Sequence, residues 1–194
     1  MAAGRDEEGI ADLLECQREE MGARASITLE WRANAAMALA ARGDGAEARR
    51  LAEEQLALAR EAGFPRPLGV ALRTLGVLSE GEDGEGMLAE AVTVLEGSSA
   101  RLEHARALVE LGSSVRRAGR RRAAREHLRA GYELARSCGS AVVLERASEE
   151  LAASGVRLRR PALASRDALT PSERRVAEMA ATGMSNPEIV QALL

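Results

Sequence analysis

The fold is decided by the segment Gly43-Asp-Gly-Ala-Glu-Ala-Arg49, which returns in altered form as Gly119-Arg-Arg-Arg-Ala-Ala-Arg125. Gly43, Gly81 and Gly119 are evenly spaced in the sequence and define a period of 38. Each of the three glycines follows one apolar segment with helical spacing and precedes another. The sequence therefore predicts a repeated unit that consists of a helix, a glycine turn and a second helix.

This period assigns approximate bounds to the helices. The first helices of the units are predicted at 29–41, 68–80 and 103–117, and the second helices at 45–61, 85–96 and 121–137. Residues 141–153 are predicted to form a terminal helix that covers the last unit. Continued backwards, the period places another turn near Gly4-Arg5 and a second helix after it, so the chain is expected to begin within a unit.

Units of this kind resemble tetratricopeptide-like repeats, whose standard length is somewhat shorter than the period found here. The expected fold class is all-α, with a tetratricopeptide-like helical-repeat array over residues 1–154. Only 2% of the residues are aromatic, so Leu, Ala and Val must build the core, with Trp31 and Tyr132 as packing anchors. Small residues such as Ala36 and Gly112 are expected to let neighbouring helices approach closely.

The C-terminal stretch predicts two short helices joined by a glycine turn. Thr170 is a suitable N-cap, and Glu173 completes a capping box three residues later. Gly183 can end the first helix, and Ser185 with Glu188 repeats the capping box for a second one. These features fit a helix-turn-helix domain and an ordinary αα-hairpin equally well.

Two strings resemble the start of the LuxR-type helix-turn-helix domain: Leu-Thr-Pro-Ser-Glu-Arg-Arg-Val-Ala-Glu at 169–178 and Gly-Met-Ser-Asn-Pro-Glu-Ile at 183–189. The resemblance implies that residues 168–194 contain the first helix and the scaffold helix of that domain. Pro187 departs from it, because the family usually has a basic residue there, and Val190 stands where the family usually has Ala. The scaffold and phosphate contacts that the resemblance implies are Thr170, Arg174, Arg175, Ser185, Asn186 and Glu188.

In that family, the recognition helix that enters the major groove follows the scaffold helix. It would come after Leu194, so we expect the 194 residues to be a fragment that binds DNA weakly and without sequence preference. Helical repeats followed by such a domain resemble the large ATP-binding regulators of the LuxR class, in which a P-loop ATPase region precedes the arm. The sequence has no G-x-x-x-x-G-K-[ST] motif, and we expect no cofactor in this chain.

The resemblance implies DNA-binding transcription regulation, with the repeats as a sensor or interaction arm for a protein partner or a second copy. An alternative stays open, in which the chain is a helical-repeat interaction module with a vestigial C-terminal end that does not bind DNA. Residues 1–155 carry 21 Arg and 26 acidic residues, a balance of −5, whereas 156–194 carry 6 Arg and 4 acidic residues, a balance of +2. The change of sign is consistent with phosphate affinity at the C-terminal end but is small.

Residues 155–167 lack a sustained helical face, contain Pro161 and are predicted to be a linker. Its arginines fit either solubilising charge or phosphate contacts; they are Arg157, Arg159, Arg160 and Arg166. A denser group surrounds the turn at Gly119, where it forms either a solvated rim or a contact surface for a partner or nucleic acid. This group consists of Arg116, Arg117, Arg120, Arg121, Arg122, Arg125 and Arg129.

No residue pattern supports an enzyme, and we propose no catalytic, cofactor-binding or metal-binding residue. His104 and His127 lie on predicted helices without a second ligand at metal-binding spacing. The pair Glu149-Glu150 is expected to be an exposed helix face, because adjacent residues do not share a face.

The sequence has no apolar run of the roughly 18 residues that a membrane span requires, and no basic-then-apolar leader. A cytoplasmic protein without membrane contact is therefore expected. Cys16 and Cys138 are expected to be buried thiols rather than a disulfide.

Overall fold

The secondary structure of the described residues consists of helices, without a strand. The computed structural model describes Gly9, residues 30–156, residues 171–182, Met184, Ile189, Gln191 and Ala192. Residues 30–156 contain α3 (Trp31–Arg42), α4 (Gly45–Ala62), α5 (Pro65–Leu78), α6 (Gly81–Glu96), α7 (Arg101–Arg117), α8 (Arg121–Ser137) and α9 (Ala141–Ala153). A further helix near the C-terminus is α10 (Pro171–Ala181). The chain divides into two compact units, Met1–Arg157 and Leu158–Leu194.

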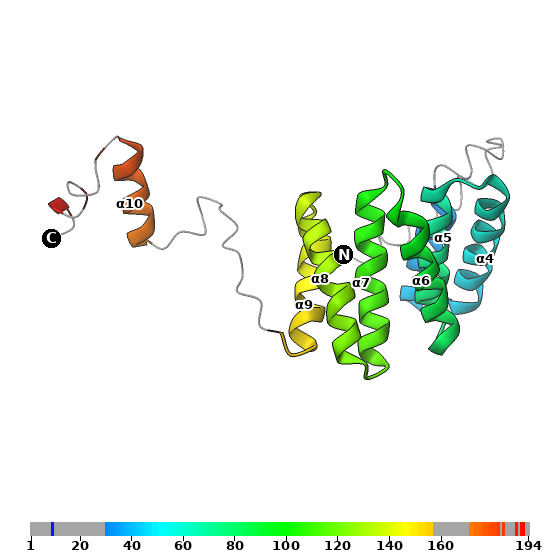
Figure 1. Ribbon diagram of the computed structural model, residues 1–194. Coiled ribbons are helices and arrows are strands. Elements are labelled where there is room, and N and C mark those ends of the chain that lie inside the picture. The colour runs from blue at the N-terminus through cyan, green and yellow to red at the C-terminus, as the bar shows by residue number, and fades with distance from the viewer. Residues whose placement is uncertain are drawn as a thin grey trace. The chain divides into compact units, whose positions relative to one another are not determined.

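Helices that follow one another in the first unit run in alternating directions and pack side by side (Figure 1). The helices α3 and α4, α5 and α6, and α7 and α8 form three hairpins, and α9 packs against both α7 and α8. The first helices of the hairpins also contact one another, α3 with α5 and α5 with α7. The hairpins are thus stacked in the order of the sequence.

The predicted turns at the three glycines are confirmed. Gly43, Gly81 and Gly119 have φ angles of 93°, 67° and 81°, in the left-handed region that glycine enters without a steric penalty. Gly43 closes α3 by donating its N–H to the carbonyl of Ala40, whereas Gly81 is itself the first residue of α6. The same backbone conformation therefore serves two slightly different turns.

The helix bounds agree with the predicted ones at α8 (121–137) and α9 (141–153), but two predicted starts are wrong. The helix α5 begins at Pro65 rather than at 68, because a proline in the first turn lacks only an N–H that has no partner within the helix. The helix α6 begins at Gly81 rather than at 85. The turn expected near Gly4-Arg5, the helix after it, and residues 157–167 of the expected linker lie outside the described residues.

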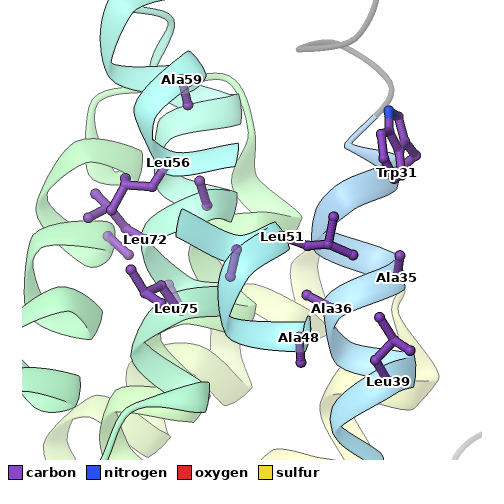
Figure 2. Close-up of a cluster of buried hydrophobic side chains, with 14 of the residues drawn as sticks. Trp31, Ala35, Ala36, Leu39, Ala48, Leu51, Leu56, Ala59, Leu72 and Leu75 are labelled. Carbon is purple, nitrogen blue, oxygen red and sulfur yellow. The ribbon is translucent and has the colours of Figure 1, made fainter. Parts of the chain in front are cut away.

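Leucine and alanine build the core, as the composition predicts. Leu51, Leu72 and Leu128 are fully buried, and the anchors Trp31 and Tyr132 keep only 4% and 6% of their surface exposed. Figure 2 shows that α4 contributes to the core on two sides. Leu51 points toward the helix that carries Ala35 and Leu39, while Leu56 lies toward Leu72 and Leu75.

Glycines inside the helices let the two partner helices of a hairpin pack closely, as expected for Gly112. A Cβ atom on Gly112 of α7 would lie 2.6 Å from Cγ of Leu128 in α8. A Cβ atom on Gly131 of α8 would lie 2.8 Å from Val109, and one on Gly76 of α5 would lie 2.8 Å from Leu88 in α6. The leucine and valine side chains therefore fill the space that the missing methyl groups leave.

Candidate functional site

The second unit contains α10, which ends where the sequence predicts. The N–H of Met184 donates to the carbonyl of Met179 at 3.2 Å, and the hydroxyl of Thr182 donates to the same carbonyl at 2.8 Å. A bond from an N–H to the carbonyl five residues before it is typical of the C-terminal end of a helix. Gly183 stands at that place in the sequence and itself lies outside the described residues.

Most of the predicted DNA-contacting residues lie outside the described part of the chain. Thr170, Ser185, Asn186 and Glu188 belong to this group. The backbone of Arg174 is helical within α10, but its side chain is not described, and Arg175 is exposed on the same helix. The two neighbouring arginines therefore belong to one helix, and the structure does not bring the six residues together as a described site.

The predicted apolar face of α10 is largely uncovered. Val176 keeps 37% of its surface exposed, Ala180 is exposed and Met179 is half-buried. From the second predicted helix of this unit, Ile189 is buried with 6% exposed, whereas Ala192 is exposed. The described residues of this unit bury little apolar surface.

A second candidate site is the arginine-rich turn between α7 and α8. Three of its seven arginines form ion pairs or hydrogen bonds with other residues of the chain. Arg116 donates from Nε to Glu150 at 2.7 Å, Arg120 forms an ion pair with Glu85, and Arg125 donates from Nε to the carbonyl of Ser154 at 3.1 Å. These three side chains tie the turn to α9 on one side and to α6 on the other.

The other four arginines of the turn have exposed side chains without an ion-pair partner in the described part of the chain. They are Arg117, Arg121, Arg122 and Arg129. The first turn of α8 contains no acidic residue, so the positive end of the helix dipole adds to the charge of Arg121 and Arg122. The surface here has a shallow depression that is open to solvent and is lined by Gly119, Arg120, Arg121, Arg122, Ala123 and Glu126.

Glu150 corrects the expectation that Glu149-Glu150 form an exposed pair. Only 5% of Glu150 is exposed, and its carboxylate lies between Arg116 at 2.7 Å and Arg146 at 3.1 Å. Burial by itself raises its pKa, but the hydrogen bond from Arg116 and the charges of both arginines outweigh burial, so the pKa is lowered. Glu149 is exposed as expected.

A further charged cluster, which the sequence reasoning missed, joins the start of α3 to α5 and α7. Glu103 of α7 pairs with Arg73 of α5 at 3.3 Å and with Arg106 at 2.7 Å, and Arg66 of α5 lies 3.5 Å from Glu30. Burial raises the pKa of Glu30 and the charge of Arg66 opposes this rise. The pairs Arg73–Glu103 and Arg66–Glu30 each link neighbouring hairpins, a relation that local spacing does not reveal.

The remaining reactive side chains are scattered. His104 is half-buried, and burial lowers its pKa, while His127 is half-buried on α8. Cys138 is exposed rather than buried, because it follows α8 at the surface. The described residues contain no group of three or more His, Cys, Asp or Glu side chains that could hold a metal ion. None of the described helices is long and apolar enough to cross a membrane.

No protein-family model matches the chain, and no curated protein matches its sequence.

Proposed function

We propose that this chain is part of a DNA-binding transcriptional regulator, with a tetratricopeptide-like arm over residues 1–154, a linker at 155–167 and the start of a LuxR-type helix-turn-helix domain at 168–194. The sequence from Leu169 to Ile189 carries the proposal. Its two strings contain a capped helix start, a glycine helix end and a second capped start at the spacing of that domain. The alternative is an interaction module without DNA binding.

The end of α10 supports the C-terminal part of the proposal. The N–H of Met184 donates to the carbonyl of Met179 at the end of α10, and the glycine that the resemblance assigns to the turn directly precedes Met184 in the sequence. Arg175 is exposed on α10, and Arg174 precedes it in the same helix. Together they supply two positive charges to a unit that carries a positive balance.

The relative height of the paired helices supports the repeated arm. Gly76 faces Leu88 in the hairpin of α5 and α6. The positions one period of 38 further along the sequence are 114 and 126. The observed contact between Gly112 and Leu128 in α7 and α8 lies two positions away from these, in opposite directions along the two helices. Opposite displacements keep the relative height of the two antiparallel helices unchanged, although two residues turn a helix by about 200°, so the packed faces differ between the hairpins.

Equivalent arginines also make equivalent contacts. Arg49 and Arg125 are separated by two periods of 38. Arg49 donates to the hydroxyl of Ser79, directly after α5, at 3.5 Å, and Arg125 donates to the carbonyl of Ser154, directly after α9. In both cases the second helix of a hairpin is fastened to the end of the next helix, which supports a common ancestry of the units.

The proposal is tested by titrating the full chain against a labelled duplex of random sequence over a series of salt concentrations. We expect the double variant Arg174→Ala, Arg175→Ala to lose at least tenfold in affinity, about 1.4 kcal/mol. The slope of log affinity against log salt should fall by about 2, because each phosphate contact contributes roughly 0.9. The matched control is Arg60→Ala, Arg136→Ala, which removes two exposed arginines of the arm and should leave binding unchanged.

Two results would decide against the proposal. The alternative, an interaction module without DNA binding, would be supported if the full chain shows no salt-dependent binding of the duplex. It would also be supported if both double variants lose the same amount of affinity for the duplex. A promoter fragment and a scrambled duplex should bind with less than tenfold difference, because the matched elements position the family domain without reading bases. A larger preference would place base-reading side chains within these 194 residues.

A further inference from the structure

Two neighbouring turns at one end of the arm carry opposite charges. The acidic tip, at the turn between α5 and α6, consists of Glu80, Glu82, Asp83 and Glu85. The basic tip, at the turn between α7 and α8, consists of Arg116, Arg117, Arg120, Arg121 and Arg122. The ion pair between Glu85 and Arg120, together with the packing of α6 against α7, places the two tips side by side.

The charges are reversed at equivalent positions. A shift by one period of 38 turns Glu82 into Arg120 and Asp83 into Arg121, while the turn glycine stays in place as Gly81 and Gly119. Both glycines have positive φ, but Gly81 is the first residue of α6, whereas Gly119 precedes Arg120, the N-cap of α8. The end of the arm is therefore an acidic patch beside a basic patch.

Each tip keeps charges that the described chain does not neutralise. Glu80, Glu82 and Asp83 are exposed without an ion-pair partner among the described residues. The arginines in the same situation on the basic tip are Arg117, Arg121 and Arg122. The pairing of Glu85 with Arg120 and of Arg116 with Glu150 leaves three carboxylates and three guanidinium groups facing solvent.

We propose that a second copy of this chain binds to this end of the arm, with the acidic tip of each copy on the basic tip of the other. A two-fold axis between the tips makes the contact self-complementary, because each residue pair then occurs twice. Arg121 and Arg122 are exposed, so the partner's carboxylates can reach them. A nucleic acid fits this end less well, because phosphates bound to the arginines would lie beside the acidic tip, whose charge repels them.

The inference concerns the arm alone and does not depend on DNA binding. Its test measures the self-association of the full chain by sedimentation velocity at about 50 mM salt and at about 500 mM salt. We expect association at low salt that weakens at least tenfold at high salt. A half-swapped variant reverses two charges of one tip. One carries Arg121→Glu together with Arg122→Glu, and the other carries Glu82→Arg together with Asp83→Arg. Each should lose self-association by at least tenfold.

A tip-swapped variant that carries all four changes separates the charge pattern from the net charge. Its formal net charge stays at −3, as in the wild type, and it should associate with itself as strongly as the wild type does. It should not associate with the wild type, because like charges then meet across the two-fold axis. Circular dichroism on each variant checks that the helices are intact. If the half-swap of the acidic tip does not fold, the double variant Glu82→Gln with Asp83→Asn takes its place.

The proposal is overturned if the wild type stays a single chain at low salt, or if the half-swaps associate as the wild type does. It is also overturned if the tip-swapped variant fails to restore association. A random duplex added at low salt tests the competing partner. If Arg121→Glu, Arg122→Glu abolishes duplex binding and leaves self-association unchanged, the basic tip binds nucleic acid and not a second copy.

Discussion

Leu128 occupies the space that a side chain on Gly112 would need, since a Cβ atom on Gly112 would lie 2.6 Å from Cγ of Leu128 and 3.2 Å from the carbonyl oxygen of Ala124. Neither atom is the free end of a flexible group, so Gly112→Ala must move α7 away from α8. We expect the free energy of unfolding to fall by about 1–3 kcal/mol. Urea denaturation followed by circular dichroism measures this change.

Gly86 is the matched control for this substitution. It also lies inside a helix, α6, but a Cβ atom added there meets nothing within 4 Å. Gly86→Ala should stabilise the chain by about 0.5–1 kcal/mol, because alanine loses less backbone entropy on folding. If Gly112→Ala and Gly86→Ala shifted stability in the same direction, the close approach of α7 and α8 would not be a constraint on the sequence.

Glu150 predicts a pH-dependent contribution to stability. Its pKa in the folded chain is lowered below the ordinary 4.5, so the folded state favours the carboxylate more than the unfolded state does. Glu150→Gln should therefore cost about 1–2 kcal/mol at neutral pH, a range reduced for the partial exposure of Arg116 and Arg146. Denaturation curves of the variant and the wild type at several pH values give this difference.

The sign of the pH effect follows from the lowered pKa. The contribution of Glu150 is fully present above 4.5 and is lost as the pH falls through the lower, folded value. The difference between wild type and Glu150→Gln should accordingly shrink below that pH. The neighbour Glu149 is exposed, and Glu149→Gln should change stability by less than about 0.5 kcal/mol at every pH. A difference for Glu150→Gln that persists undiminished in acid would contradict the role of its charge.

Arg125 is expected to hold the end of α9. Its Nε donates to the carbonyl of Ser154, at a helix end where carbonyl groups lack partners within the helix. Arg125→Ala should speed amide exchange at Ser154, Gly155 and Val156 about tenfold, which corresponds to roughly 1.4 kcal/mol of local stability. Arg129→Ala serves as the control, since that arginine is exposed on the same helix. Equal exchange in the two variants would show that the contact does not stabilise α9.

The helices of the arm could be predicted because local features define them. The turn glycines set their ends, and apolar residues at helical spacing set their faces, so the bounds of α8 and α9 are correct. The predicted start of α5 is wrong because Pro65 and Pro67 signal a break unless their place in the first helical turn is recognised.

The charged contacts could not be predicted, because they depend on which hairpins become neighbours. Glu149 and Glu150 are the same residue type in adjacent positions, and the approach of Arg116 from α7 encloses Glu150 between Arg116 and Arg146 of its own helix. The reversal from Asp83 to Arg121 can be read from the sequence once the period of 38 is known. Their juxtaposition requires the packing of α6 against α7.

Low local stability is expected for α10. It has 11 residues, and isolated helices shorter than about 12–15 residues are marginal in water. Val176 is 37% exposed and Ala180 is exposed, whereas Val109 of α7 is buried with 1% exposed. In the full chain, amides from Val176 to Ala181 should exchange about 100-fold faster than those from Val109 to Gly112, a difference of roughly 2.8 kcal/mol.

Val176→Ala is the internal control, because truncating a side chain with little buried surface should leave the exchange of α10 nearly unchanged. Protection in α10 equal to that in α7, together with a marked loss in Val176→Ala, would mean that this apolar face is covered in solution.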